Sequence, residues 1–557
     1  MSLKVLIIGG VAGGASAAAR LRRLDEDAEI ILFEKDEHIS FANCGLPYYI
    51  GKVIKERDNL LVQTPEGMRE RFNIDVRVQC EVKRIIRDKK SVEVYSHATG
   101  KTYCETYDKL ILSPGAIPFK PNIPGLDHPK VFTLRNIPDV DAIKEFVDQL
   151  HPEKVVVVGA GFIGLEMAEN LRRRDVEVTI VELADRILPS LDFEMSALVH
   201  QHILEKGVNV IRNNGVHALH HKDERTVVEL TDGQRLYADM VILGIGVRPE
   251  VALAKEAGLD LGVTGGIAVD EFLKTSDPDI YAVGDAIEVR DFISGNPALI
   301  PLAGPANKQG RVVANNICGR EDKYVATQGT AILKVFDMAV AVTGLNESTL
   351  QKYGIPYKKS ISHSSSHALY YPGSSGLSVK VLFGPDSGKL LGAQVVGGGS
   401  VDKTIDAFSI AMRAGMTIFD LEKLELSYAP PFSSAKTPIN IAGYVASNTL
   451  RGDCNTYYWD DVAKLDPDKS LLVDVRTPFE YKMEGTIEGA INIPVDHLRA
   501  RLNEIPKNKE IYVFCAIGLR AYVACRILTQ KGFKVKNLSG GYKTYSAAYD
   551  TFHNVIW

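Results

Sequence analysis

The sequence has no long apolar run and no strong excess of charge of either sign. None of its apolar runs reaches the roughly 18 residues that a membrane span needs, and the formal net charge is only −5 over 557 residues. This balance gives no electrostatic reason to bind nucleic acid or an anionic membrane surface. The first apolar stretch, VLIIGG, is short and has no cleavage site after it. We therefore expect no signal peptide, and a cytoplasmic location.

The seven cysteines include no CxxC pair and no histidine at a ligand-like spacing. This pattern argues against a disulfide framework and against a structural zinc site, so we expect no metal. Most of these cysteines are expected to be small buried apolar residues, namely Cys80, Cys104, Cys318, Cys454 and Cys525. The remaining two, Cys44 and Cys515, lie in segments that carry further chemical signals.

The chain opens with an apolar strand, a glycine-rich turn and an alanine-rich helix, KVLIIGGVAGGASAAARLRR. A second apolar strand, EIILFE, ends at Glu34, and this order is typical of a dinucleotide fold. In such a fold the helix N-terminus binds a pyrophosphate and the acid binds ribose hydroxyls. Val11 occupies the place of the second glycine of the GxGxxG pattern. The flanking strands and Glu34 nevertheless predict a nucleotide site.

A second copy of the pattern follows in KVVVVGAGFIGLEMAENL, and its next strand ends at Glu182. Two such sites on one chain suggest that one nucleotide passes electrons to the other. An acid at Glu182 favours NAD, because it would repel a 2′-phosphate, whereas the nearby Arg186 leaves NADP open.

Three later segments run from an apolar strand into a glycine or proline turn: YDKLILSPGAIP, ADMVILGIGVRPE and TSDPDIYAVGDA. With them, residues 1–445 resemble the pyridine nucleotide-disulfide oxidoreductases, which are flavoproteins with two dinucleotide domains. The resemblance implies FAD at the first site, NAD(P)H at the second, and a hydrogen bond from Asp285 to the ribityl chain of the flavin. The predicted cofactor-binding residues are Gly9, Gly10, Val11, Ala12, Gly13, Gly14, Glu34, Lys35, Asn43, Ser113, Pro114, Gly115, Gly159, Gly161, Phe162, Ile163, Gly164, Glu182, Gly246, Gly284, Asp285, Pro301, Leu302 and Ala303.

Cys44 lies in SFANCGLPYYI, and the fifth residue after it is Tyr49 rather than a second cysteine. An internal CxxxxC disulfide is therefore excluded, and the oxidised state must be a sulfenic acid or a mixed disulfide. The peroxidase and oxidase branch of the family carries a histidine in the first glycine turn, where this chain has Ala12. The segment resembles SFxNCxLPY of the coenzyme A-disulfide reductases, which favours a mixed disulfide with coenzyme A. Against an oxidised flavin, we expect Cys44 to be a thiolate.

The same resemblance implies the residues that contact substrate. They are Arg20, Arg23, Ser40, Asn43, Arg71 and Asn307. It also implies that Tyr370 and Tyr428 reach across a homodimer to the cysteine of the other subunit, where a phenol could protonate the leaving thiolate. Tyr371 remains an alternative to Tyr370. Without the resemblance, the arginines would be read as a solvated helix face and the tyrosines as packing residues.

The C-terminal hundred residues or so form a separate alternating pattern that includes LLVDVR, GAINIP, EIYVFCAIGLRAYVACRIL and a closing SGGY. It resembles the rhodanese domain, with Thr486 in place of the usual histidine. The loop CAIGLR, from Cys515 to Arg520, has the shorter form that carries sulfur rather than the longer form that holds phosphate. Its backbone N–H groups predict an anion cradle. We expect Cys515 to carry a persulfide and Arg520 to orient the loop or meet an anionic donor, while a catalytically silent rhodanese domain remains open.

We predict an α/β protein with two Rossmann-like dinucleotide-binding domains for FAD and NAD(P), an α+β dimerisation domain and a C-terminal rhodanese α/β domain. The expected boundaries are 1–117 with 246–324 for FAD, 118–245 for NAD(P)H, 325–447 for dimerisation, 448–463 for a linker and 464–557 for the rhodanese domain.

The predicted function is FAD-dependent, NAD(P)H-driven reduction of coenzyme A disulfide, or of coenzyme A persulfide and polysulfide, with sulfane sulfur handled by the rhodanese domain. One alternative is an NADH peroxidase or oxidase that uses a Cys44 sulfenic acid. Another is a redox-sensing or scaffold protein with negligible turnover.

Overall fold

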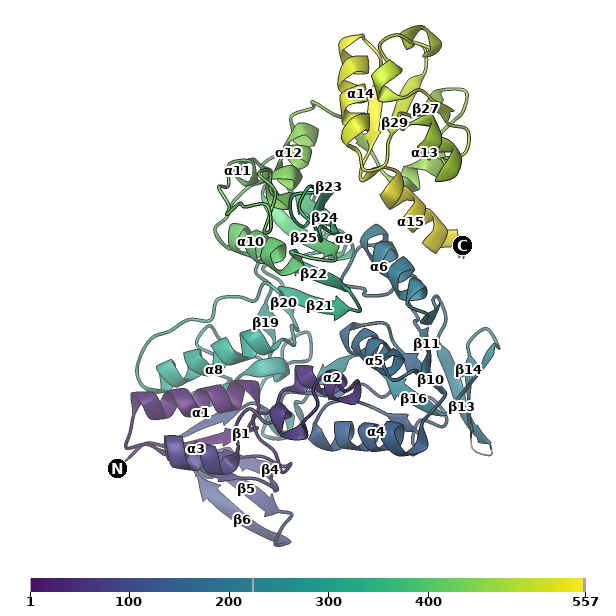
Figure 1. Ribbon diagram of the computed structural model, residues 1–557. Helices are drawn as coiled ribbons and strands as arrows, with labels where there is room; N and C mark the ends of the chain where they lie inside the picture. The colour runs from purple at the N-terminus through teal and green to yellow at the C-terminus, as the bar shows by residue number, and fades with distance from the viewer. Residues whose placement is uncertain (1, 223–224, 554–557) are drawn as a thin grey trace. The chain divides into compact units, whose positions relative to one another are not determined.

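The structure is a computed structural model that describes residues 2–222 and 225–553 (Figure 1). The last four residues of the expected C-terminal domain, 554–557, lie outside the described residues. The chain forms two compact units, one over Met1–Leu183 and Asn214–Gly329, the other over Ala184–Asn213 and Thr330–Trp557. Within the described residues, no helix is long and apolar enough to cross a membrane.

The first unit contains a parallel sheet in the order β18-β7-β1-β2-β3. Apart from the edge strand β3, its strands are short and largely apolar, as expected for a parallel sheet that is buried on both faces. Their bounds are β1 Lys4–Ile8, β2 Glu29–Phe33, β3 Asp75–Arg77, β7 Lys109–Leu112 and β18 Ile280–Ala282. An antiparallel sheet follows β3 along the chain, with β4 Cys80–Ile86, β5 Ser91–Ser96 and β6 Lys101–Thr106.

Two helices pack side by side on this parallel sheet, α1 (Ala12–Leu24) and α8 (Ala303–Ile317) (Figure 1). Their close approach depends on glycine, because a Cβ at Gly310 would lie 2.3 Å from the carbonyl oxygen of Gly13. This contact places α8, which is distant in sequence, against the first glycine turn of the chain.

A second parallel sheet of the same unit has the order β11-β10-β16-β9. Its strands and the helices that follow them along the chain repeat the strand, turn and helix order of the first sheet. Their bounds are β9 Val131–Phe132, α4 Ile137–Leu150, β10 Lys154–Val158, α5 Phe162–Arg172, β11 Glu177–Val181 and β16 Met240–Leu243. A three-stranded antiparallel sheet, β13 Val216–Lys222, β14 Arg225–Leu230 and β15 Arg235–Ala238, precedes β16.

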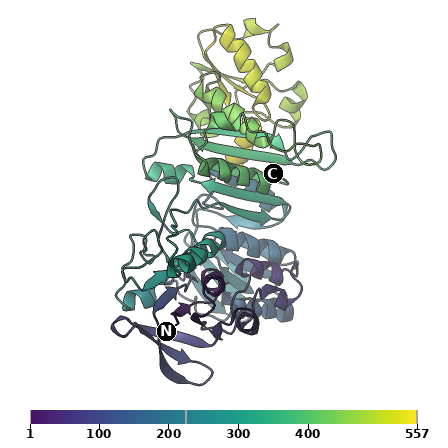
Figure 2. The same ribbon diagram turned by 90° about the vertical axis from the view of Figure 1, so that its left-hand side faces the viewer.

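The second unit contains a five-stranded antiparallel sheet in the order β21-β22-β25-β24-β23 (Figure 2). Strands β24 and β25 are almost fully buried, so this sheet forms the centre of its domain. Its bounds are β21 Ala331–Val335, β22 Met338–Gly344, β23 Lys358–Ser365, β24 Gly376–Phe383 and β25 Leu390–Gly397. The associated helices are α6 Phe193–Glu205, α9 Glu347–Lys352, α10 Val401–Arg413, α11 Ile418–Leu421 and α12 Pro438–Leu450.

The C-terminal domain of the second unit is a five-stranded parallel sheet in the order β26-β30-β29-β27-β28. Parallel strands need crossover connections, and helices supply several of them here. The elements are β26 Thr456–Tyr457, β27 Ser470–Asp474, α13 Pro478–Met483, β28 Ile491–Asn492, β29 Glu510–Phe514, α14 Leu519–Gln530, β30 Val535–Leu538 and α15 Gly541–His553.

This C-terminal domain is hydrogen-bonded to strand β23 of its own chain. The backbone N–H of Ile361 donates to Ser539 Oγ at 3.1 Å, and the phenol of Tyr458 donates to the carbonyl oxygen of Lys359 at 2.9 Å. Trp459 stacks on Phe193 of α6, with ring centroids 5.2 Å apart. The domain is thus attached at an edge strand and at a helix of the same unit.

Candidate active site

The first glycine turn follows β1 directly and is held by two glycines that no other residue could replace. Gly9 has a φ of +97°, and a Cβ there would lie 2.1 Å from the carbonyl oxygen of Ser113. A Cβ at Gly14 would lie 1.9 Å from the carbonyl oxygen of Gly9. The turn therefore leads tightly into α1, whose first N–H groups have no acceptor within the helix. Such a helix end can bind a pyrophosphate.

Glu34 ends β2 beside this turn. Its carboxylate accepts hydrogen bonds from the N–H of Gly10 at 3.0 Å and from the N–H of Asp36 at 3.2 Å. Burial raises the pKa of Glu34, while these two N–H groups act in the opposite direction. The acid is therefore fixed at the edge of the turn, where a ribose would lie.

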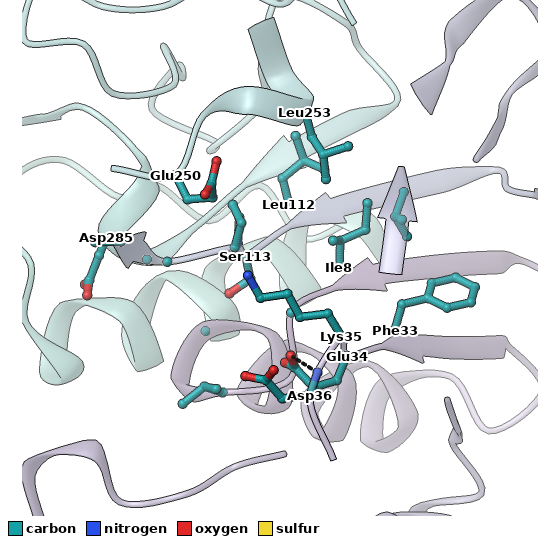
Figure 3. A pocket seen from close by; sticks show the side chains of 18 of the residues that line it. Ile8, Phe33, Glu34, Lys35, Asp36, Leu112, Ser113, Glu250, Leu253 and Asp285 are labelled. Atoms are coloured by element: carbon teal, nitrogen blue, oxygen red, sulfur yellow. Dashed lines mark hydrogen bonds between the residues drawn. The ribbon is translucent and has the colours of Figure 1, made fainter. Parts of the chain in front are cut away.

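A cavity of about 410 Å³ opens beside these residues (Figure 3). Twelve of the predicted cofactor residues line it: Gly9, Val11, Ala12, Gly13, Glu34, Lys35, Asn43, Ser113, Pro114, Gly115, Gly284 and Asp285. Arg135 and Glu250 also line the cavity, and no sequence motif predicted them. Burial raises the pKa of Asp285, and Arg135 opposes that rise. Glycine turns, a helix N-terminus and a ribose-binding acid in one cavity fit a dinucleotide.

The remaining residues predicted for the first site lie close to these along the chain. Gly10 donates to Glu34, and Gly14 packs against Gly9 beneath the turn. Leu302 is the N-cap of α8, Ala303 is its first residue, and Pro301 precedes them.

The second glycine turn repeats the geometry of the first. Gly159 has a φ of +99°, and a Cβ at Gly164 would lie 2.0 Å from its carbonyl oxygen. The N–H of Ala160 donates to Glu182 at 2.7 Å, as that of Gly10 donates to Glu34. A Cβ at Gly161, the N-cap of α5, would meet no atom within 4 Å. The turn is thus open above the helix, where a second nucleotide could approach.

Three more residues predicted for this second site lie at its edges. Phe162 and Ile163 begin α5, and Gly246 has a φ of +102° in the loop after β16. Arg186, which the sequence analysis weighed as a ligand for a 2′-phosphate, donates to the carbonyl oxygen of Leu191 at 3.0 Å and to Asp185 at 2.9 Å.

Cys44 lies in a short 3₁₀ turn, Asn43–Gly45, immediately before helix α2 (Leu46–Ile50). The residue is exposed, yet desolvation of the thiol raises its pKa, and the carboxylates of Glu166 and Asp285 raise it further. The surrounding protein groups therefore favour the thiol. The thiolate that the sequence analysis expects would require the flavin.

Glu166 is a functional candidate that the sequence analysis missed. It lies in the second turn of α5 and accepts a hydrogen bond from the phenol of Tyr48 at 3.2 Å. Burial raises the pKa of Glu166 to about 7. A carboxyl that titrates near neutral pH beside a cysteine is typical of an active site. Its only sequence signal was its position, two residues after Gly164 of the glycine turn.

The predicted substrate residues of the first unit cluster on α1 and α8. The Arg20 Nε donates to Asn315 Oδ1 at 3.0 Å, and Arg23 is exposed. Asn307 binds the hydroxyl of Ser16 and the carbonyl oxygen of Ala303. Desolvation lowers the pKa of Arg20, as do the nearby guanidinium groups of Arg311, Arg320 and Arg23. The two helices thus present a concentration of positive charge.

The other three predicted substrate residues lie on separate segments, and one of them, Asn43, begins the 3₁₀ turn that contains Cys44. Ser40 has a φ of +45° in the loop after β2, and Arg71 is exposed on helix α3 (Pro65–Phe72).

Tyr370 and Tyr428 come from separate loops of the second unit and meet at their phenols. The two hydroxyl groups lie 3.0 Å apart, and both side chains are exposed. The hydrogen bond between the two phenols raises the pKa of Tyr370. Tyr371 instead contacts His367, at a ring-centroid distance of 5.8 Å. The structure therefore pairs Tyr428 with Tyr370 rather than with Tyr371.

Cys515 follows β29 and lies fully buried at the base of its loop. The N–H of Gly518 donates to its sulfur at 3.2 Å, as the predicted anion cradle requires. Arg520 forms two hydrogen bonds to the carboxylate of Glu480, at 2.8 and 2.5 Å. Thr486, the departure from the rhodanese pattern, donates to Asp474 at 3.0 Å.

Comparison with known proteins agrees with this architecture. Residues 3–310 match the family model described as pyridine nucleotide-disulphide oxidoreductase, and residues 330–438 match the dimerisation domain of that family. The chain belongs to the pyridine nucleotide-disulphide oxidoreductase family. Residues 459–548 match the rhodanese-like domain. The family, the α/β fold class and the C-terminal rhodanese domain predicted from the sequence are confirmed.

Several relatives share most of the chain. A coenzyme A disulfide reductase of Staphylococcus haemolyticus is 36% identical over 444 residues, which is 80% of this chain and 99% of that protein. The crystal structure of reduced Bacillus anthracis CoADR-RHD is 51% identical, with a TM-score of 0.96 over 98% of both chains. A NAD-dependent persulfide reductase from A. fulgidus is 39% identical, with a TM-score of 0.92 over 99% of this chain and 100% of that one.

These findings make the protein an NAD(P)H-dependent flavoprotein disulfide reductase and a homologue of coenzyme A disulfide reductases. Membership of the family implies FAD and NAD(P)H as cofactors, and the matching dimerisation domain suggests a homodimer.

Proposed function

We propose that this chain reduces coenzyme A disulfide, or coenzyme A persulfide and polysulfide, through Cys44 as its one redox cysteine. The observation that carries the proposal is the position of Cys44 beside the first nucleotide cavity with Tyr49 five residues later. At the position where a CxxxxC pair would have its second cysteine, this chain has Tyr49. The ring of Tyr49 packs against α4, 5.1 Å from the ammonium of Lys144. An internal disulfide is thereby excluded, and the proposal assigns the oxidised state of Cys44 to a mixed disulfide with an external thiol.

The first glycine turn, Glu34 and Asp285 would hold FAD, which supplies a two-electron path from the reduced nicotinamide to the sulfur of Cys44. The second glycine turn and Glu182 would hold the nicotinamide dinucleotide. NADH is preferred over NADPH, because Glu182 would repel a 2′-phosphate and Arg186 is engaged with Asp185 and Leu191.

In the first chemical step the Cys44 thiolate attacks one sulfur of the substrate. A bond forms between Cys44 and coenzyme A sulfur, and the substrate S–S bond breaks to release a thiolate or hydrosulfide. Two electrons then cleave the mixed disulfide and regenerate Cys44 as a thiolate, with coenzyme A as the second released thiol. Each released thiolate takes up one proton.

Charge and hydrogen bonding suit an anionic substrate of this kind. The cations of α1 and α8, with Arg71, would bind phosphate groups, and arginine suits phosphate through paired hydrogen bonds. Asn307 and Ser40 would complete the contacts. In a homodimer, Tyr370 and Tyr428 of one subunit would lie at Cys44 of the other and donate a hydrogen bond to the departing thiolate.

Cys515 would carry sulfane sulfur as a persulfide in this scheme and deliver it to coenzyme A or toward Cys44. The N–H of Gly518 supports this role, because it already donates to the Cys515 sulfur. Replacing Cys515 with serine tests the relay: we expect slower NADH oxidation with sulfane donors and unchanged oxidation with coenzyme A disulfide. Equal rates with sulfane donors would contradict it.

The decisive experiment is the intact mass of the purified protein before and after a reductant, with peptide mapping of residue 44. We expect a coenzyme A adduct on Cys44 that the reductant removes, and loss of NADH-dependent coenzyme A disulfide reduction in Cys44→Ser. A gain of one oxygen instead, with peroxide-dependent NADH oxidation, would indicate the peroxidase alternative. Negligible NADH oxidation with every acceptor would indicate a scaffold.

A further inference from the structure

The helix that follows the Cys515 loop, α14, and the helix tied to it through Arg520 and Glu480, α13, both carry exposed apolar side chains. Phe479 and Met483 lie four residues apart on α13, so they share one face of that helix. Leu519 and Val523 do the same on α14. The exposed fractions of Phe479, Met483 and Leu519 are 70, 69 and 67%. We call these residues, together with the exposed Ile517 of the loop, the apolar rim.

The ion pair of Arg520 and Glu480 connects α14 to α13, the two helices that carry the apolar rim. Arg520 lowers the pKa of Glu480 to about 2, so the carboxylate is ionised throughout the physiological range. The guanidinium is therefore neutralised by a bidentate partner rather than free to bind a substrate anion. Glu480 raises the pKa of Arg520, and Cys515, which also hydrogen-bonds the guanidinium, acts in the same direction.

Three other cations lie on nearby segments of this domain. Arg476 is fully buried and paired with Asp474 at 2.7 Å. The ammonium of Lys543 would lie 3.6 Å from a Cβ at Gly376, so it points to strand β24. Lys482, between Tyr481 and Met483, is exposed on α13. A donor that approaches Cys515 thus meets apolar side chains and an ion pair without net charge, and Lys482 is the exposed cation of α13.

We propose that Cys515 accepts sulfur from an organic persulfide whose carrier is uncharged near the sulfane sulfur, and that the apolar rim and the Arg520–Glu480 pair disfavour the thiosulfate dianion. The proposal rests on the proposed sulfur-carrying role of Cys515 and names its substrate class.

The transfer step balances without an oxidant or a reductant. The Cys515 thiolate attacks the terminal sulfur of R–S–SH, a bond forms between Cys515 and that sulfur, and the S–S bond of the persulfide breaks. The organic thiolate leaves and takes up a proton, while the sulfane sulfur keeps its oxidation state. With thiosulfate the leaving group is sulfite, which carries two negative charges.

Charge decides between the two donors. Bringing a dianion into an apolar rim removes water from two charges, and this costs free energy unless a cation compensates. Glu480 offsets most of the charge with which Arg520 could compensate, because both terminal nitrogens of the guanidinium donate to its carboxylate. A thiolate leaving group has a single charge, and an uncharged carrier gains contact with the rim.

The test is sulfur loading of the full-length protein, followed by intact mass after brief exposure to equal concentrations of thiosulfate or of the persulfide of 2-mercaptoethanol. We expect the 32 Da gain on Cys515 to form at least about tenfold faster from the organic persulfide, the size of one charge-assisted hydrogen bond. Equal or faster loading by thiosulfate would overturn the inference. No 32 Da gain on the peptide of Cys515 from either donor would overturn the proposed sulfur-carrying role instead.

One variant tests whether the charge of Glu480 causes the preference for an organic persulfide over thiosulfate. Glu480→Gln removes the charge but keeps the N-terminal cap of α13, because a glutamine amide oxygen can still accept from the N–H of Thr477. We expect thiosulfate loading to rise about tenfold, with little change for the organic persulfide. Glu504→Gln is the matched control, since it breaks a bidentate pair with Arg501 elsewhere in the domain. No rise in Glu480→Gln, or an equal rise in the control, would contradict the assignment to Glu480.

Discussion

The phenol of Tyr48 donates to the carboxyl of Glu166 at 3.2 Å, which joins the helix that follows Cys44 to the helix of the second glycine turn. Burial places the pKa of Glu166 near 7. The electrostatic state of the redox cysteine therefore changes within the physiological pH range, because an ionised Glu166 raises the pKa of Cys44.

We predict that Glu166→Gln lowers the pKa of Cys44. Removing a nearby negative charge favours the thiolate, so the rate of alkylation by iodoacetamide should begin to rise at a lower pH than in wild type. Glu145→Gln, on an exposed site of α4, should leave the alkylation profile unchanged. Superimposable profiles for wild type and Glu166→Gln would show that the two groups are not coupled.

The same substitution should alter stability with a defined sign. The ordinary pKa of Glu166 is 4.5 and the folded value is about 7, so ionisation opposes folding increasingly between these pH values. Glu166→Gln should melt at a higher temperature than wild type at pH 8, and at the same temperature near pH 4.5.

The sequence predicted those parts of the molecule that are local along the chain. Each glycine turn combines a strand, a turn and a helix within about thirty residues, and the CAIGLR loop is equally compact, so pattern and spacing were sufficient. Pairs of residues that are distant along the chain and meet only after folding could not be predicted. Glu166 is 118 residues from Tyr48, and Arg520 is 40 residues from Glu480. Nothing in the sequence indicated that Glu480 neutralises Arg520.

The duplicated glycine turns predict separate losses of the two cofactors. Gly14→Ala places a methyl group 1.9 Å from the carbonyl oxygen of Gly9, and Gly164→Ala places one 2.0 Å from that of Gly159. The first variant should be purified with little flavin absorbance at about 450 nm. The second should keep its flavin but show a strongly raised KM for NADH.

A third glycine serves as the control for stability. Gly161→Ala should melt like wild type, because a methyl group there meets no atom within 4 Å. Loss of flavin from Gly164→Ala with retention in Gly14→Ala would reverse the assignment of the two sites.

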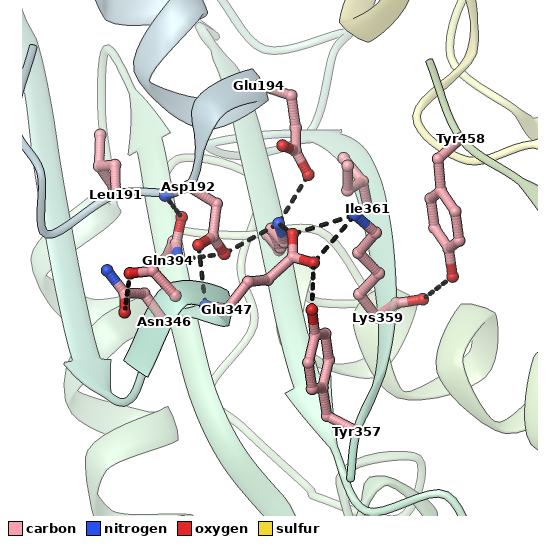
Figure 4. A network of polar contacts seen from close by, with 12 residues as sticks. Leu191, Asp192, Glu194, Asn346, Glu347, Tyr357, Lys359, Ile361, Gln394 and Tyr458 are labelled. Atoms are coloured by element: carbon pink, nitrogen blue, oxygen red, sulfur yellow. Dashed lines mark hydrogen bonds and ion pairs between the residues drawn. The ribbon is translucent and has the colours of Figure 1, made fainter. Parts of the chain in front are cut away.

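A buried lysine holds three carboxylates together in the second unit (Figure 4). The ammonium of Lys380 is fully buried and contacts Asp192 at 2.8 Å, Glu194 at 2.6 Å, and Glu347. Burial alone would raise the pKa of Glu347, but Lys380 and Lys359 lower it to about 2. Removing Lys380 would leave buried negative charges without a partner.

We therefore predict that Lys380→Met lowers the free energy of unfolding by about 3–5 kcal/mol at pH 7.5, as measured by urea denaturation. The loss should be smaller at pH 4.5, because carboxylates without Lys380 bind protons more readily. Lys206→Met, which breaks the more exposed pair with Asp337, should cost less than about 1 kcal/mol. A similar small cost for both variants would mean that the buried cluster contributes no more than a surface pair.

The rhodanese domain is attached to the dimerisation sheet through a histidine that must stay neutral. His363 is buried in β23, with Nδ1 2.8 Å from Ser378 Oγ and Nε2 2.8 Å from Thr544 Oγ1. Burial lowers its pKa to about 3, and the charge of Lys543 acts in the same direction. Since the ordinary pKa is 6.5, the unfolded chain binds this proton first as the pH falls.

The free energy that holds the rhodanese domain on the sheet should consequently fall as the pH drops below about 6.5. Protonation of His363 alone accounts for at most about 1.4 kcal/mol per pH unit. Fluorescence of Trp459, which stacks on Phe193, offers a readout during urea denaturation at pH 7.5 and 5.5. His363→Gln can still form hydrogen bonds but cannot titrate, so its midpoint should fall less between the two pH values than that of wild type. His97→Gln, at an exposed pair with Glu81, should behave like wild type. An equal fall in wild type and His363→Gln would place the acid sensitivity in the carboxylates rather than in His363.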